Sequence, residues 1–154
     1  MSEYIHKAHN VSVLMYHIVC PAKYRRVVIS EVVDKTLKET CEEIDKRYEI
    51  KFLEIGTEGD HVHFLVQSVP TYSPTKIVRI IKSITAKEIF KKHSEVKEKL
   101  WGGEFWSDGH YVSTVGKHGD EETIGNYVKA QGTGKEYKQL YKVRKEEKQP
   151  SLFD

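Results

Sequence analysis

The chain has 154 residues, of which 38% are hydrophobic and 31% are charged, and its formal net charge at pH 7 is only +2. This composition is typical of one globular domain that buries its own core, and it excludes a disordered or fibrous chain. With so small a net charge, the overall field of the protein does not indicate nucleic-acid binding. Contacts with phosphates would have to depend on local clusters of cations.

The cysteines and the N-terminus indicate the compartment. Cys20 and Cys41 form no Cys-x-x-Cys pair and predict neither a disulfide framework nor a zinc site. The first residues lack a basic-then-apolar signal, and no apolar run reaches membrane-spanning length. We therefore expect a cytoplasmic protein with no membrane partner.

The first half of the chain predicts a strand, a helix and a second strand. β-branched and aromatic residues favour a strand over 11–19, which Pro21 ends. Ser30 is a candidate N-cap for a helix over about 31–47, where apolar residues have helical spacing. A strand over about 49–56 follows.

The next elements repeat this order. A turn over 57–60 returns the chain as a third strand over 61–66, a hairpin partner of the second. Ser73, followed by proline, begins a helix over about 74–93. A charged connection then leads to a fourth strand over about 105–115.

This order predicts an α+β fold, the ferredoxin-like or RRM-like split βαβ sandwich, with two helices on one face of an antiparallel sheet. Beyond it, helical spacing from Ile124 to Gln131 predicts an added helix, which the Gly-Thr-Gly sequence at 132–134 ends. A charged helix over about 135–147 precedes the tail. We therefore expect a catalytic domain over 1–134 and a C-terminal helix with a flexible tail over 135–154.

The third strand carries the candidate metal ligands. His61 and His63 alternate with Val62, Phe64 and Val66, so the two imidazoles share the open face of the sheet and the apolar side chains lie under the helices. Two neighbouring imidazoles can chelate a divalent metal ion. The alternative is a surface strand that carries two histidines without a metal.

The added helix carries a candidate nucleophile and a third ligand. Tyr127 and Gln131 are four residues apart and face the same way. If this helix docks on the open face, Gln131 adds an oxygen ligand and Tyr127 reaches a phosphodiester on the metal. A phenol with an ordinary pKa of about 10 needs local activation to attack phosphorus. The alternative is a core tyrosine beside a surface glutamine.

Five sequence blocks occur in a specific order: Lys23-Tyr24-Arg25-Arg26, Asp60-His61-Val62-His63-Phe64-Leu65, Tyr72-Ser73-Pro74-Thr75-Lys76, Trp101-Gly102-Gly103-Glu104-Phe105-Trp106-Ser107-Asp108-Gly109 and Tyr127-Val128-Lys129-Ala130-Gln131. Together they resemble the single-tyrosine transposases of the insertion-sequence 200/605 family, members of the HUH (His-hydrophobic-His) nuclease superfamily. The resemblance extends over about residues 11–132.

The resemblance implies a function and a site. His61 and His63 would be the metal ligands, Gln131 would complete a magnesium or manganese site, and Tyr127 would form a covalent 5′-phosphotyrosine. Such enzymes of the prokaryotic cytosol cut and rejoin single-stranded DNA at hairpin-bearing element ends. They act as homodimers in which the tyrosine helix of one subunit serves the histidine pair of the other. The two imidazoles by themselves favour manganese.

Further residues are candidates for DNA contacts and for support of the metal ligands. The candidates for DNA contacts combine cations with an aromatic ring on which bases can stack. A solvated charged face would show the same residues. Asp60 is a candidate acceptor that orients His61, with a turn-forming role as the alternative. We treat His17, His110 and His118 as structural or surface residues. The DNA-contact candidates are Lys23, Tyr24, Arg25, Arg26, Lys76, Arg79 and Lys82.

The tail suggests a separate interaction. Gln149, Leu152 and Phe153 resemble the short peptides that dock on the bacterial replication sliding clamp, although an inert terminus is the alternative. Other functions also stay open: an HUH replication or relaxase nickase, a domesticated relative that processes repeats, and a non-catalytic RRM-like nucleic-acid-binding module. Such a module would display aromatic residues on its open face, whereas this strand displays histidines.

Overall fold

The computed structural model describes residues 14–116 and the backbone of 136–138. In chain order its elements are β1 (Leu14–Pro21), a 3-10 turn η1 (Lys23–Arg25), α1 (Glu31–Arg47), β2 (Ile50–Glu58), β3 (His61–Ser68), α2 (Pro74–Lys92), α3 (Ser94–Lys99), β4 (Tyr111–Val115) and β5 (Glu136–Lys138).

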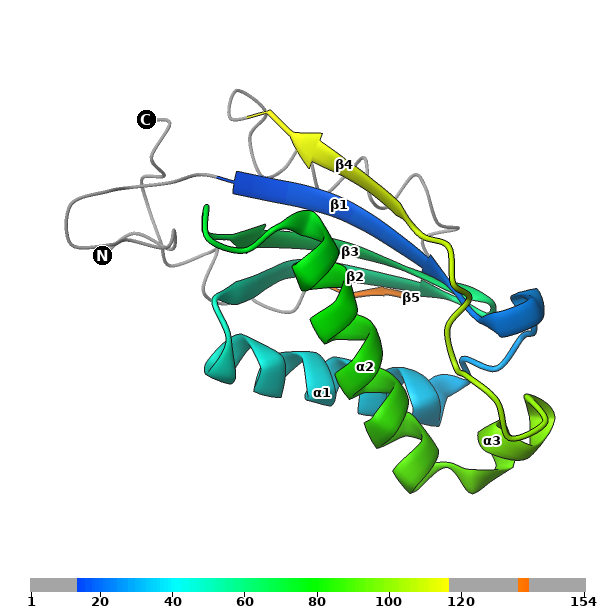
Figure 1. Ribbon diagram of the computed structural model, residues 1–154. Coiled ribbons are helices and arrows are strands. Elements are labelled where there is room, and N and C mark those ends of the chain that lie inside the picture. Colours follow the sequence, from blue (N-terminus) through cyan, green and yellow to red (C-terminus); the bar gives the residue numbers. More distant parts are fainter. Residues whose placement is uncertain (1–13, 117–135, 139–154) are drawn as a thin grey trace.

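The strands form one antiparallel sheet in the order β4-β1-β3-β2-β5, with α1 and α2 on one face (Figure 1). The first four strands and the two helices follow the order of the ferredoxin-like sandwich, so the predicted fold is confirmed. β3 lies between β1 and β2, which places the His-Val-His sequence in the middle of the sheet.

The two main helices begin where their caps predict. The Ser30 hydroxyl accepts a hydrogen bond from the Val33 amide, and the Ser73 hydroxyl accepts one from the Lys76 amide, at 3.4 and 3.0 Å. Each bond satisfies an amide that lacks a partner within the helix. The bounds of α1 match the predicted 31–47, and those of α2 match 74–93 to within one residue.

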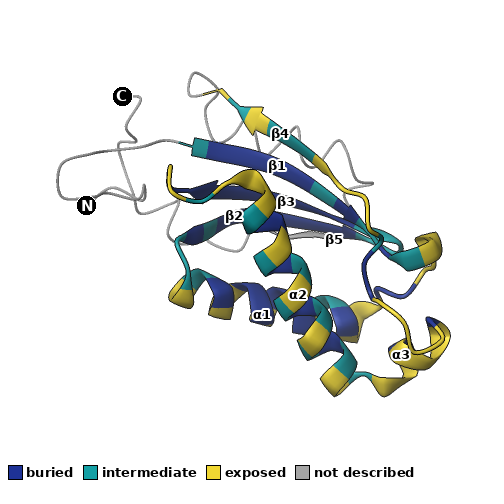
Figure 2. Ribbon diagram, viewed as in Figure 1, coloured by how far each residue is buried: buried dark blue, intermediate teal, exposed yellow. Residues whose placement is uncertain are grey.

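The core lies between the sheet and the two helices. Val62, Phe64 and Val66 are fully buried there, as the alternation in β3 predicts. Burial of one such side chain contributes roughly 1.5–3 kcal/mol. The central strands of the sheet are buried along most of their length (Figure 2). A β-bulge between Phe52 and Glu54 of β2 shifts the register by one residue, which brings both Phe52 and Ile55 into this core. The hydrophobic pattern of β3 therefore determines which of its side chains face the helices and which lie on the opposite face of the sheet.

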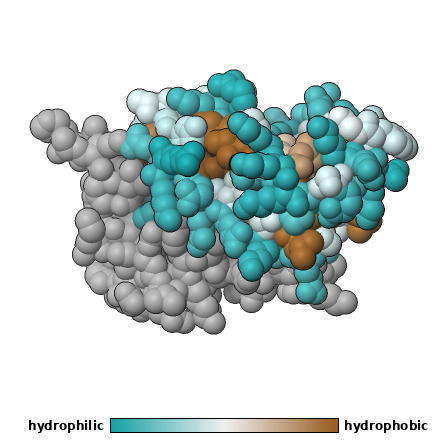
Figure 3. Space-filling model, turned by 90° about the horizontal axis from the view of Figure 1, so that it is seen from below, coloured by the Kyte–Doolittle hydropathy of each residue, from teal (hydrophilic) through white to brown (hydrophobic). Residues whose placement is uncertain are grey.

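The outer surface on the helix side is mainly hydrophilic. Viewed from that side, its hydrophobic side chains form separate patches among polar ones (Figure 3). None of the helices within 14–116 and 136–138 is long and apolar enough to cross a bilayer.

The structure corrects three predicted elements. The fourth strand is predicted from about residue 105, but β4 begins at Tyr111. Phe105 and Trp106 lie before it and are buried in the core. Trp106 makes only an isolated bridge, with Ala22. The charged connection contains α3. The helix predicted over 135–147 is wrong at 136–138, where β5 pairs with β2. β5 adds to the outer edge of β2, and pairing between strands overrides local helix preference. The helix predicted from Ile124 to Gln131 and the boundary between 134 and 135 lie outside the described residues.

Candidate metal centre

Histidines from two neighbouring strands meet on the sheet face opposite α1 and α2. β3 supplies His61 and His63, which point away from the core because Val62 and Phe64 point into it. β1 supplies His17. These rings border a hollow of about 390 Å³. Its lining residues are His17, Val19, Pro21, Arg25, His61, His63 and Tyr111.

Asp60 fixes the first imidazole. Its carboxylate lies 2.7 Å from Nδ1 of His61, and because a carboxylate accepts, Nδ1–H is the donor. A neutral His61 then carries its lone pair on Nε2. Arg25 lies 3.3 Å from the other carboxylate oxygen of Asp60. The hydrogen bond from His61, together with the charge of Arg25, lowers the pKa of Asp60, so the acceptor stays ionised.

His17 contacts the second imidazole. Its Nε2 lies 3.1 Å from Nδ1 of His63, and the two rings are stacked with centroids 5.3 Å apart. His63 is 4% exposed, and its Nε2 is buried without a hydrogen-bond partner among the described residues. A buried polar atom without a partner costs stability unless a ligand satisfies it.

The surroundings keep His63 neutral. Burial, followed by the nearby His61 and His17, lowers the pKa of His63 to about 4, while Glu58 acts in the opposite direction. Burial also lowers the pKa of His17. A neutral imidazole is the form that binds a metal ion, so at neutral pH a proton competes weakly for His63.

These contacts select one tautomer for a metal-bound state. If Nε2 of His63 donates its lone pair to a metal, the ring proton must sit on Nδ1 and be donated to Nε2 of His17. Both histidines of the pair then offer Nε2, while their Nδ1 atoms are held by Asp60 and His17. The residues present therefore fit a divalent metal ion that accepts nitrogen ligands.

The remaining predicted members of this centre lie beyond its described part. Tyr127 and Gln131, the predicted nucleophile and third ligand, lie outside the described residues, as do His118 and the tail residues Gln149, Leu152 and Phe153. Within 14–116 and 136–138, no group of three or more His, Cys, Asp and Glu side chains is arranged to hold a metal ion.

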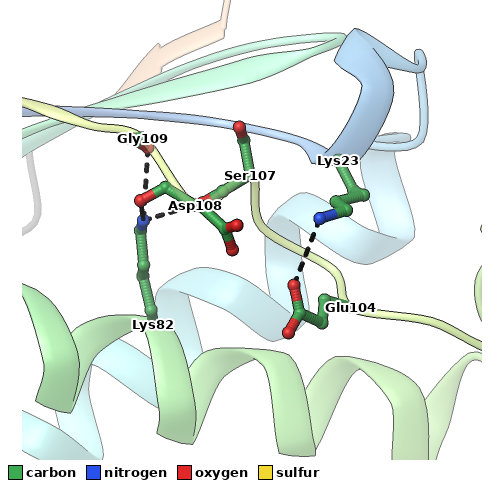
Figure 4. A network of polar contacts seen from close by, with 6 residues as sticks. All are labelled: Lys23, Lys82, Glu104, Ser107, Asp108 and Gly109. Atoms are coloured by element: carbon green, nitrogen blue, oxygen red, sulfur yellow. Dashed lines mark hydrogen bonds and ion pairs between the residues drawn. The ribbon is translucent and has the colours of Figure 1, made fainter.

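Two of the predicted DNA-contact cations, Lys23 and Lys82, have polar protein partners. The Lys23 ammonium pairs with Glu104 at 3.3 Å, and the Lys82 ammonium donates to three backbone carbonyls, of Ser107, Asp108 and Gly109 (Figure 4). All three N–H donors of Lys82 are thus engaged, and they tie the segment before β4 to α2.

Among the other candidates, Arg26 and Arg79 are exposed and Lys76 is half-buried. Arg26 stacks on Trp101, and Lys76 lies over the Tyr72 ring with its ammonium 4.2 Å from the centroid. Arg79 is exposed at the rim of a second hollow of about 550 Å³, between α2 and residues 103–110. His110 lines that hollow rather than the metal centre.

Sequence reasoning missed two residues of the centre. His17, expected to be structural, contacts His63, and Tyr111 lines the same hollow with its ring plane at 71° to that of His17. The alternation of residues in β1 could have predicted the position of His17. Tyr16 and Ile18 are core residues, so His17 between them must point to the opposite face of the sheet. Cys20 and Cys41 are free and buried, and we assign them no chemical role. Burial raises the pKa of Cys20 to about 12, so its thiol stays protonated at neutral pH and is a poor nucleophile.

Comparisons with known proteins point to one family. A family model described as "Transposase IS200 like" matches residues 10–131. The ISDra2 transposase TnpA of Deinococcus radiodurans is 30% identical over 119 residues, 77% of this chain and 84% of that protein. The transposase for insertion sequence element IS200 of Salmonella typhimurium is 31% identical over 120 residues, 75% of each protein.

Solved structures agree with these sequence relatives. A crystal structure of a candidate transposase from Deinococcus radiodurans superposes with a TM-score of 0.66 at 26% identity, over 82% of this chain and 97% of that one. A REP-associated tyrosine transposase bound to a REP hairpin gives a TM-score of 0.52 at 10% identity, over 83% of this chain and 68% of that one. The second likeness shows the fold alone.

Proposed function

Because the chain belongs to the family of IS200-like transposases, we propose that it cuts and rejoins single-stranded DNA at hairpin-bearing ends of an insertion sequence. Membership of this family implies a DNA-cleaving enzyme. In the proposal Tyr127 is the nucleophile, and His61, His63 and Gln131 hold a magnesium or manganese ion. The observation that carries the proposal is the buried Nε2 of His63, which has no hydrogen-bond partner among the described residues.

The described residues contribute orientation and charge. Asp60 holds the His61 ring and His17 holds the His63 ring, so each imidazole offers a defined nitrogen. Arg25 borders the same hollow and places a positive charge where a phosphate would enter. When bound, a divalent ion neutralises charge on the phosphodiester and helps to align it for in-line attack.

The proposed covalent step conserves phosphoester bonds. The phenol of Tyr127 loses its proton and its oxygen bonds to phosphorus as the bond to the 3′ oxygen breaks. The departing oxygen takes up a proton to become a free 3′ hydroxyl, so the number of protons is unchanged. The DNA on the other side stays attached to Tyr127 through its 5′ phosphate. A 3′ hydroxyl from another strand end then reverses the step and releases the tyrosine, so rejoining needs no nucleotide cofactor.

The proposed assembly is a homodimer with shared active sites. Two ends must be cut and exchanged, which requires two nucleophiles near each other. In the proposal the helix that carries Tyr127 serves the histidine pair of the partner subunit.

A covalent adduct tests the proposed function. The full chain is incubated with manganese and 3′-labelled single strands that tile the DNA flanking its gene, and the products are separated under denaturing conditions. We expect label on the protein, lost with Tyr127→Phe and strongly reduced with His61→Ala. An unlabelled protein that still binds these strands would favour the non-catalytic module, whereas adducts at replication origins or host repeats would favour the nickase or the domesticated relative.

The tail carries an independent proposal. A peptide with Gln149, Leu152 and Phe153 is proposed to dock on the replication sliding clamp, which would bring the enzyme to single-stranded template. Binding of the tail peptide to purified clamp, with a Leu152→Ala, Phe153→Ala peptide as control, tests it. Equal binding of both peptides contradicts the proposal.

A further inference from the structure

Two aromatic rings lie exposed beside each other at the end of the sheet near the metal centre. Tyr24 and Trp101 are 61% and 71% exposed, although such large apolar surfaces are normally buried. Their ring centroids are 5.3 Å apart, with the planes tilted by 55°. The rings come from distant parts of the chain, η1 and the turn that follows α3. We name this pair the aromatic platform.

The backbone that presents the aromatic platform is held in an unfavourable conformation. Tyr24, Arg25 and Trp101 have φ of 60°, 52° and 57°, and they are the non-glycine residues with positive φ in the described part of the chain. Each such residue is strained and persists because its surroundings hold it. Strain of this kind concentrates at functional sites.

Hydrogen bonds hold both turns in place. The Lys23 amide donates to the carbonyl of Phe105 at 2.8 Å, which joins η1 to the segment after the Trp101 turn. The amides of Trp101 and Gly102 donate to carbonyls of α3, at 2.9 and 2.7 Å. The Lys23–Glu104 ion pair adds a side-chain link between the same two segments (Figure 4). The rings are therefore positioned before a ligand arrives.

Cations border both rings. The Arg26 guanidinium lies 5.0 Å from the centroid of Trp101, and the Lys23 ammonium lies 5.6 Å from that of Tyr24. Exposed rings flanked by cations suit single-stranded nucleic acid, because bases stack on the rings and phosphates pair with the cations. In a double helix the base faces are already stacked on one another.

A chain of contacts joins the aromatic platform to the metal centre. Arg25, next to Tyr24, lines the hollow of the histidine pair and pairs with Asp60, which in turn holds His61. We propose that Tyr24 and Trp101 stack unpaired bases of the DNA strand that is cut beside His61 and His63, an inference that rests on the proposed function. The stacked bases flank the scissile phosphate and fix its position over the histidines.

Tryptophan fluorescence reports on the aromatic platform directly. The chain has two tryptophans, and Trp106 is 4% exposed with its indole N–H donated to Thr85. The difference in tryptophan fluorescence between the parent protein and its Trp101→Phe variant is therefore the fluorescence of Trp101. We use Tyr127→Phe protein without metal as the parent, so that no cutting occurs, and titrate it with each of the single strands that tile the DNA flanking the gene.

We expect these strands to quench Trp101, and an abasic site at the stacked position to remove the quenching. Trp101→Ala should weaken single-strand binding roughly 5- to 160-fold, the range for one stacked base, whereas Trp101→Phe should restore most of the affinity. Thermal unfolding of both variants provides the folding control. Because Trp101 is exposed, both variants should melt near the parent protein.

Failure of this inference is distinguishable from failure of the proposed function. If the chain with Tyr127 intact forms the covalent adduct, while Trp101 of the Tyr127→Phe parent stays unquenched and Trp101→Ala binds DNA normally, the aromatic platform is not a base-binding site. Such a result would leave it as a surface for another protein. If DNA quenches Trp101 while no adduct forms with manganese, the base-binding inference stands and the nuclease function fails.

Discussion

Acidification of the metal-free protein should destabilise the fold through His63. In the folded chain its pKa is lowered from 6.5 to about 4, because the ring is buried beside His61 and His17. At 1.36 kcal/mol per pKa unit this fall corresponds to at most about 3 kcal/mol. Solvent in the hollow screens part of the effect, so we expect a loss of roughly 1–2 kcal/mol.

The direction follows from which state binds the proton first. The unfolded chain protonates His63 below pH 6.5, whereas the folded chain keeps it neutral until about pH 4. The contribution to stability is therefore fully present above pH 6.5 and is lost as the pH falls from 6.5 to about 4. A His63→Gln variant lacks this contribution at every pH.

Urea unfolding in the presence of a chelator measures the effect. We expect the difference in unfolding free energy between the parent chain and His63→Gln to shrink by roughly 1–2 kcal/mol from about pH 7 to about pH 4. His110→Gln serves as a matched control, because His110 is exposed and should contribute less pH dependence. The same pH dependence in the parent chain and in His63→Gln would refute this explanation.

Three further predictions concern other contacts. His17→Leu removes the acceptor for His63 and should weaken manganese binding, measured by calorimetry, about 10- to 100-fold. His17→Gln should retain more affinity than His17→Leu. Equal manganese affinity of His17→Leu and the parent chain would refute the assigned tautomer. Lys82→Met removes three hydrogen bonds to carbonyls and should lower the free energy of unfolding by about 1–2 kcal/mol, and unchanged stability contradicts this. A mixture of Tyr127→Phe and His61→Ala proteins should regain cleavage if the sites are shared between subunits, whereas no recovery refutes sharing.

Local sequence patterns were sufficient for the helices and the central strand. The hydroxyls of Ser30 and Ser73 cap α1 and α2 by accepting hydrogen bonds from amides three residues away. The start of each helix can therefore be predicted from nearby residues alone. The alternation in β3 assigns Val62 to the core beneath the helices and His63 to the opposite face without knowledge of any partner strand, although His63 is itself buried on that face.

Features that depend on pairing between distant residues were not predictable in this way. β5 forms because β2 offers an edge, and the local sequence around residue 136 favours a helix. His17 meets His63 through the register of β1 and β3, which the sequence of β1 does not specify. The positive φ of Trp101 depends on its turn after α3, so its pairing with Tyr24 becomes visible only in three dimensions.

A manganese titration followed by electron paramagnetic resonance tests most directly whether the histidine pair holds a metal ion. We expect the full chain to bind manganese at a site that His61→Ala and His63→Ala each weaken severely, while the exposed-residue variant His110→Gln binds normally. Unchanged manganese affinity in the His61→Ala, His63→Ala double variant, with its fold intact, would contradict the account.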